Sequence, residues 1–196
     1  MSVEIVRTIL QDAESALQAL LANANGMKAI ADAGALLADT FKKGGRVFSC
    51  GNGGSMCDAM HFAEELSGRY RLDRPALAAA SISDPSHISC VGNDYGYEFI
   101  FSRYIEAHAR AGDCLVAIST SGKSKNVMTA VAAAKKQGVK VIGMTSKPDT
   151  LLGQASDICI ATPGGQYADR VQELHIKSIH IMIELVERAL FPQNYK

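Results

Sequence analysis

The sequence predicts an α/β fold in which a five-stranded parallel sheet lies between two layers of helices, forming a three-layer sandwich. Short apolar runs alternate with segments that carry apolar residues at helical spacing. The runs are almost continuously apolar, as expected for parallel strands that are buried on both faces. Two of them end in loops of glycine or small hydroxyl residues, the type of loop with which α/β folds bind ligands at the carboxyl ends of strands.

Two extra helices are expected at the N-terminus, before the first strand. Apolar residues recur at helical spacing in residues 3–21 and again in residues 27–41. Gly44 and the glycine after it end the second helix. We expect residues 1–43 to serve packing or oligomerisation.

The alternation of strands and helices continues to the end of the chain. After the glycine stop, each apolar run is bounded by turn residues and is followed by a loop or a helical stretch. The expected strands are residues 46–50, 77–81, 114–118, 139–144 and 157–161, and the expected helices are residues 55–66, 97–109, 125–137 and 167–190.

The loop after the third expected strand, residues 119–124, has the sequence Ser-Thr-Ser-Gly-Lys-Ser. Free backbone N–H groups at the start of a helix and small hydroxyl side chains together favour a bound phosphate. A simpler alternative is that Ser124 only caps the helix. The loop ends like a nucleotide-triphosphate loop, but Ala117 stands where that motif requires its first glycine. A smaller phosphorylated ligand is therefore favoured.

The glycine-rich loop at residues 51–55 could indicate a dinucleotide site. That fingerprint requires a third glycine where Met56 stands and an acidic residue at the end of a second strand, and both are missing. We therefore exclude a nicotinamide cofactor. Since both loops follow strands, they are expected to share one site near the switch point of the sheet.

The composition restricts the partners of the protein. The 196 residues carry 20 basic and 20 acidic side chains, and no basic cluster is interleaved with aromatics, which argues against nucleic acid. The first 15 residues place acids where a signal peptide is apolar, and no run approaches membrane-spanning length. We expect a cytoplasmic protein with one domain over residues 1–196, no membrane partner, and five cysteines that are reduced core thiols.

Two expected helices carry residues suited to proton transfer. Asp58, His61 and Glu65 share one face of the helix over residues 55–66, although a solvated polar face has the same spacing. His180 lies within an apolar run of the last helix. A buried histidine needs a polar partner, which His61 or Glu65 would supply.

Four motifs in this sequence together resemble the phosphoheptose isomerases of the SIS (sugar isomerase) family. They are CGNGGSxCDAxHFAEEL at residues 50–66, GND at 92–94, ISTSGxS at 118–124 and ADRxQExHIKxIH at 168–180. The resemblance implies the flavodoxin-like SIS fold and a homotetramer with sites at subunit interfaces. It also implies a ketose–aldose isomerase that converts sedoheptulose 7-phosphate to D-glycero-D-manno-heptose 7-phosphate, for heptose and lipopolysaccharide core biosynthesis.

The resemblance also assigns roles to residues. It implies that Glu65 and His180 are the catalytic acid/base pair, a pairing that suits the movement of a carbonyl between two carbons of a sugar. It implies one zinc ion per subunit, held by His61, Glu65, Gln172 and His180. The implied substrate contacts are Asn52, Gly53, Gly54, Glu65, Asn93, Asp94, Ser119, Thr120, Ser121, Ser124, Asp169 and Gln172.

Several alternatives stay open. Gln172 and His180 lie about 12 Å apart along a helix axis, so both can bind one ion only if long side chains converge or if two chains contribute ligands. His175 is a second candidate ligand, ranked below His180. Lys123, where the family loop has asparagine, either contacts phosphate or points to solvent, and His87 either lines the mouth of the site or is structural.

A second hypothesis is a sugar-phosphate-binding protein without catalysis. Some proteins of the SIS fold are sensing domains or bind a replication initiator, and they keep the phosphate loop while lacking the acid/base residues. Glu65 and His180 are both present here, and no DNA-binding segment is attached, so the sequence favours the enzyme.

Overall fold

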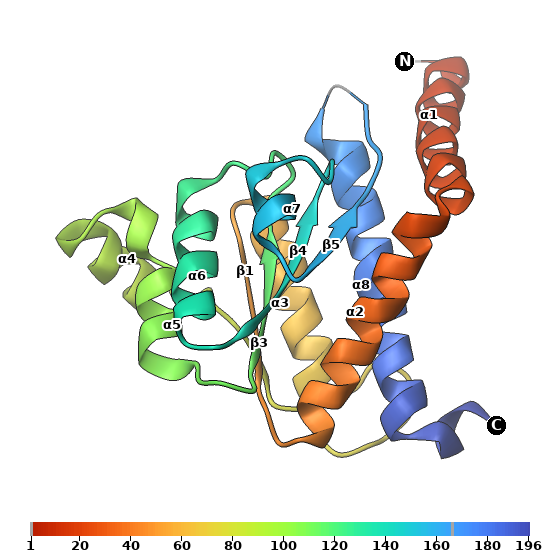
Figure 1. Cartoon of the computed structure of the whole chain (residues 1–196). Helices are drawn as coiled ribbons and strands as arrows, with labels where there is room; N and C mark the ends of the chain where they lie inside the picture. The colour runs from red at the N-terminus through yellow and green to blue at the C-terminus, as the bar shows by residue number, and fades with distance from the viewer. Residues whose placement is uncertain (1, 166) are drawn as a thin grey trace.

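A parallel sheet of five strands forms the centre of the molecule (Figure 1). The structure is a computed structural model that describes residues 2–165 and 167–196. All strand pairs are parallel and their spatial order is β2-β1-β3-β4-β5, so the predicted α/β fold with a five-stranded sheet is confirmed. The strands are β1 (Val47–Gly51), β2 (Ala79–Ser81), β3 (Cys114–Ile118), β4 (Lys140–Thr145) and β5 (Ile158–Ala161).

Helices cover both faces of the sheet, because alternate side chains of each strand point to opposite sides. In β3, Val116 and Ile118 enter one core with α2, α3 and α8, whereas Leu115 and Ala117 enter a second core with α5 and α6. The helices are α1 (Val3–Ala22), α2 (Ala24–Lys42), α3 (Gly54–Ser67), α4 (Pro85–Asp94), α5 (Ser102–His108), α6 (Lys125–Lys136), α7 (Leu151–Ala155) and α8 (Ala168–Leu190), with 3-10 helices η1 (Tyr97–Phe99) and η2 (Pro192–Tyr195).

The two N-terminal helices differ in how they pack against the rest of the molecule. Asn23 separates them and caps α2 by accepting a hydrogen bond from the backbone N–H of Gly26 at 3.0 Å. Helix α2 packs along α8, whereas α1 stands at the side of the molecule (Figure 1). The α1 side chains Val3, Ile9 and Leu10 are exposed. Their exposure leaves an apolar surface on α1.

The order of the strands places the two predicted loops next to each other. The strand that follows β1 in the chain, β2, lies on one side of it, and β3, β4 and β5 lie on the other side. The position between β1 and β3 is therefore the switch point of this topology. Gly51 at the end of β1 is in register with Ile118 at the end of β3. The loops that follow these strands therefore emerge side by side, as the sequence predicts.

Some local predictions were wrong. The single helix expected over residues 97–109 is divided into η1 and α5, and the helices α4 and α7 were not predicted. His87 therefore lies on a helix rather than in a loop. Cys57 and Cys90 are exposed, so the prediction that all five cysteines are core thiols fails for these two, while Cys50 and Cys114 are buried. No helix within the described ranges combines the length and apolarity needed to cross a membrane.

Candidate active site

The hydroxyl loop between β3 and α6 brings three serine side chains together. Ser119 Oγ lies 3.0 Å from Ser124 Oγ and 3.5 Å from Ser121 Oγ. Ser124 is the N-cap residue of α6, but its side chain makes no capping hydrogen bond, so the simple capping alternative does not account for it. Gly122 has a φ of +62°, and a Cβ there would lie 2.3 Å from Thr150 Cβ. The tight turn therefore requires glycine.

The glycine loop after β1 is joined to the first turn of α6, which directly follows the hydroxyl loop. The side-chain amides of Asn52 and Asn126 exchange hydrogen bonds of 2.9 and 2.7 Å, and Asn126 is 3% exposed. The Tyr97 hydroxyl donates to Asn52 Oδ1 at 3.2 Å. A cavity of about 430 Å³ opens here, bordered by these three side chains and by Ser124. A second cavity of about 250 Å³ borders the other side of the hydroxyl loop, at Ser121.

The start of α8 lies against the glycine loop. A Cβ at Gly54 would lie 2.7 Å from Gln172 Nε2, so a larger residue there would displace this side chain. Gln172 is thereby placed at the first turn of α3, beside the loops. This contact joins the N-terminal part of α8 to the carboxyl edge of the sheet.

Farther along α3 and α8, the imidazole rings of His61 and His180 are in contact. His61 Nε2 lies 2.9 Å from His180 Nε2, and Glu65 Oε1 lies 3.6 Å from His61 Nε2. His61 Nδ1 faces the Glu64 carboxylate at 3.0 Å, which favours the tautomer with the proton on Nδ1. In that tautomer His61 Nε2 accepts and His180 Nε2 donates. The expected polar partner of His180 is therefore His61.

The environment shifts the acid/base properties of both candidate catalytic groups. Burial raises the pKa of the Glu65 carboxyl, and the neighbouring Glu64 charge raises it further. Burial lowers the pKa of His180, with a smaller effect in the same direction from His61 and Lys177. Both shifts disfavour the charged form, so His180 is neutral at pH 7, and Glu65 is a stronger base than an ordinary carboxylate.

Part of the implied zinc set fits this geometry. His61, Glu64 and Glu65 each offer one ligand atom within 4.8 Å of the others, and His180 Nε2 adjoins His61. Imidazole nitrogen and carboxylate oxygen are the usual donors to zinc. Gln172, by contrast, contacts Gly54, about 10 Å along α3 from His61. One chain thus places His61 beside both Glu65 and His180, while the described group of ligand atoms within 4.8 Å of one another contains Glu64 rather than His180.

Comparison with known proteins decides the family. The SIS domain profile matches residues 11–146. The phosphoheptose isomerase of Aeromonas hydrophila is 55% identical over 187 residues, covering 95% of this chain and 97% of that protein. The chain belongs to the SIS family and, within it, to the phosphoheptose isomerases.

Solved structures of phosphoheptose isomerases share the fold. The structure from Neisseria gonorrhoeae is 34% identical with a TM-score of 0.86, covering 94% of this chain and 97% of that one. The structure from Francisella tularensis is 29% identical with a TM-score of 0.88, covering 96% of this chain and 99% of that one. The α/β sandwich predicted from the sequence is therefore the fold of phosphoheptose isomerases.

The structure of this phosphoheptose isomerase family member also shows where the remaining predicted site residues lie. Asn93 and Asp94 are exposed at the end of α4, where Asn93 donates to Asp94 at 2.7 Å. They directly precede the segment with Tyr97 that borders the larger cavity. Asp169 is exposed at the start of α8 and accepts from the backbone N–H of Arg170. Their contacts with substrate stay predictions, as does every assigned role in the site.

Sequence reasoning missed four residues that adjoin the predicted ones. Asn126 and Tyr97 hold Asn52, Glu64 faces His61, and the Tyr70 ring centre lies 5.8 Å from that of His180. Only Glu64 carried a usable signal, since it follows His61 by three residues on a helix. Lys123, left open by the sequence, has an exposed side chain.

Proposed function

We propose that this protein interconverts sedoheptulose 7-phosphate and D-glycero-D-manno-heptose 7-phosphate in heptose and lipopolysaccharide core biosynthesis. Membership of the phosphoheptose isomerases supports this reaction. The single observation that supports catalysis, rather than binding alone, is the meeting of His61, Glu65 and His180 on adjoining helices. A protein that only senses a sugar phosphate needs the hydroxyl loop but has no use for this trio.

In the proposed mechanism the substrate is held by its phosphate and reacts at its other end. The serine hydroxyls and the free N–H groups at the start of α6 bind the phosphate. Glu65 removes a proton from C1 of the ketose, and the electrons form the C1–C2 double bond of an enediol. His180 Nε2 donates its proton to the C2 oxygen and takes up the proton of the C1 hydroxyl, and Glu65 delivers its proton to C2, which completes the aldose. Binding energy at the phosphate fixes C1 and C2 relative to Glu65.

The other substrate contacts belong to the loops around this anchor. The proposed residues are either small or carry hydrogen-bonding side chains, which suits a sugar with many hydroxyl groups. It consists of Asn52, Gly53, Gly54, Glu65, Asn93, Asp94, Ser119, Thr120, Ser121, Ser124, Asp169 and Gln172.

We also propose one zinc ion per subunit, held by His61, Glu65 and His180 together with Gln172. Since Gln172 adjoins Gly54, the fourth ligand fits best as a contribution from a second chain. When bound, zinc would polarise the sugar oxygens as a Lewis acid, and it would take the place of the Nε2 proton of His180 in that task. Metal analysis of purified protein should find one zinc per subunit, and His61→Gln should lose it. Retention of full metal content in that variant would contradict the ligand set.

The proposed assembly is a cytoplasmic homotetramer of single SIS domains that span residues 1–196. The exposed apolar side chains of α1 support the proposed use of the N-terminal helices, within residues 1–43, in oligomerisation. Sedimentation equilibrium should give four subunits, and a stable monomer would contradict the assembly.

A substrate pair tests the proposed function. Purified protein should produce aldose from sedoheptulose 7-phosphate and have a kcat/KM at least about 100-fold lower with unphosphorylated sedoheptulose, because the remote anchor is lost. Aldose formation is measured by NMR of the sugar products. The absence of product from sedoheptulose 7-phosphate would refute the proposal and favour the binding-protein hypothesis.

A further inference from the structure

Arg74 lies in the segment after α3 and is buried together with an acidic partner from α8. Its Nε lies 2.8 Å from Glu187 Oε1, and both side chains are completely shielded from solvent. Burial of two charges is unfavourable unless their remaining hydrogen-bonding groups are also satisfied. The other partners of these two groups therefore indicate what the pair stabilises.

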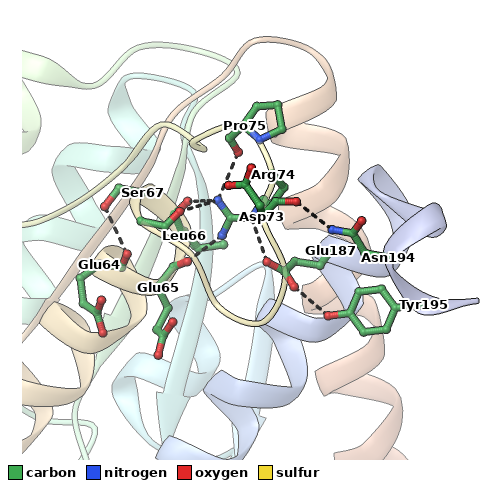
Figure 2. A network of polar contacts seen from close by, with 11 residues as sticks. Glu64, Glu65, Leu66, Ser67, Asp73, Arg74, Pro75, Glu187, Asn194 and Tyr195 are labelled. Carbon is green, nitrogen blue, oxygen red and sulfur yellow. Dashed lines mark hydrogen bonds and ion pairs between the residues drawn. The ribbon is translucent and has the colours of Figure 1, made fainter.

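The guanidinium of Arg74 closes the C-terminal end of α3 (Figure 2). Its Nη2 donates to the carbonyl of Glu65 at 2.7 Å, and its Nη1 donates to the carbonyls of Leu66 and Gly68 at 2.8 and 3.1 Å. The last carbonyls of a helix have no partner within the helix and carry partial negative charge. Arg74 thus fixes the backbone of Glu65, the proposed base.

Glu187 is a residue of α8, and it joins the Arg74 cap to this helix and to the C-terminal end of the chain. Its second oxygen, Oε2, accepts a hydrogen bond of 2.7 Å from the Tyr195 hydroxyl (Figure 2). Burial raises the pKa of Tyr195, and the hydrogen bond to Glu187 raises it further, so the phenol keeps its proton. Asn194 adds a bond to the carbonyl of Asp73, next to Arg74, at 3.2 Å.

The same two helices carry the proposed catalytic groups. Glu187 lies about 10 Å beyond His180 along α8, and the capped carbonyl belongs to Glu65 itself. The Arg74–Glu187 pair, which caps α3, and the contact of His61 with His180 hold the C-terminal half of α3 against α8. Tyr70, in the segment that Arg74 anchors, packs near His180.

We propose that Arg74, Glu187 and Tyr195 form a clamp that positions Glu65 against His61 and His180. The clamp residues act through the helices and are positioning residues rather than catalytic ones. The inference rests on the proposed isomerase function, since the geometry it maintains is that of the proposed acid/base pair. It predicts that disturbing the clamp lowers kcat while KM stays near its original value, because the proposed phosphate anchor is the hydroxyl loop and the start of α6, which the clamp residues do not contact.

Arg74→Lys tests the clamp because lysine keeps the charge opposite Glu187 but cannot reach the helix carbonyls and Glu187 together. With sedoheptulose 7-phosphate we expect kcat to fall by about tenfold or more and KM to change by less than about twofold. Tyr195→Phe removes one hydroxyl and should lower kcat by about threefold; it keeps the test decisive if Arg74→Lys does not fold. The ring nitrogen chemical shifts of His61 and His180, recorded by NMR, should move in both variants.

Arg46→Lys is the matched control. Arg46 also pairs with a buried carboxylate, Asp113, at 2.9 Å, but it directly precedes β1, and its guanidinium bonds to Asp113 and to the carbonyl of His108 rather than to α3 or α8. We expect a loss of thermal stability with kcat and both histidine shifts unchanged. The clamp is refuted if Tyr195→Phe and any folded Arg74→Lys keep the original kcat and shifts, or if Arg46→Lys lowers kcat equally. No turnover by the unmodified protein would refute the isomerase function, and the histidine shifts would then decide the clamp.

Discussion

His175 shows how a single buried residue makes stability depend on pH. The side chain is fully buried, Nε2 donates to the carbonyl of Thr145 at 3.4 Å, and Nδ1 has no partner among the described residues. Burial lowers the pKa of His175 to about 4, from 6.5 in an exposed histidine. This position favours a structural role over the ligand role that the sequence left open.

The sign of the pH effect follows from proton binding. Between pH 6.5 and 4 the unfolded chain binds a proton at His175 and the folded chain does not, so the free energy of unfolding falls as pH falls. From pH 7 to 5 the loss should be about 2 kcal/mol. It is measured by urea unfolding at fixed protein concentration.

His175→Gln provides the comparison, because glutamine does not titrate. Its free energy of unfolding should fall by about 2 kcal/mol less than that of the original protein over the same pH range. Other groups titrate in this window, among them Asp58, whose pKa burial raises to about 6, and the comparison cancels them. Parallel pH profiles for the two proteins would contradict the assignment.

Single residues were predictable from the sequence where the partner is near in the chain or where the residue type is rare in its surroundings. His61 and Glu65 share a helix face at a spacing of four, and His180 stands out in an apolar run. Asn126 and Arg74 could not be found in this way. Their partners Asn52 and Glu187 are 74 and 113 residues distant, so only the folded chain brings them together.

At the scale of elements, the hydroxyl loop is proposed to act as a phosphate anchor. The double change Ser121→Ala with Ser124→Ala removes two hydroxyl donors while leaving the backbone and Gly122 in place. Hydrogen bonds to charged groups contribute about 1.5–3 kcal/mol each, so KM should rise by at least about tenfold. The fall in kcat should be smaller, because α3 and α8 carry the proposed acid and base.

Lys123→Ala is the control within the same loop. The Lys123 side chain is exposed, and we expect its removal to change KM by less than about twofold. Steady-state kinetics with sedoheptulose 7-phosphate measure both variants. An unchanged KM in the double serine variant would refute the anchor, and a large effect of Lys123→Ala would assign the phosphate to the lysine instead.

Strands and long helices were predicted from apolar periodicity, and the errors concern short or interrupted helices. Helix α7 has only five residues, little more than one helical turn, so no repeated apolar spacing can be read from it. Helix α4 does carry a readable start, with Asp84 as N-cap and Pro85 in its first turn, but it has little apolar periodicity. The run from Phe99 to Ile105 keeps helical spacing although the helix is interrupted, so periodicity alone could not reveal the break.

At the scale of the whole molecule, the order of the strands explains how residues that are far apart in the chain come close together. The switch point between β1 and β3 places the glycine and hydroxyl loops side by side. The first loop leads into α3, and α8 returns from the end of the chain to lie against it. The anchor and the proposed acid/base pair are thus separate parts of one α/β framework.

The central claim is that Glu65 moves a proton between C1 and C2 of a phosphorylated heptose. Its most direct test is incubation with sedoheptulose 7-phosphate in deuterated water, comparing by NMR the original protein, Glu65→Gln and the control Glu106→Gln, which changes an exposed glutamate of α5. We predict aldose with deuterium at C2 from the original protein and from Glu106→Gln, and none from Glu65→Gln, with substrate affinity retained. Aldose formed by Glu65→Gln at the original rate would contradict the account.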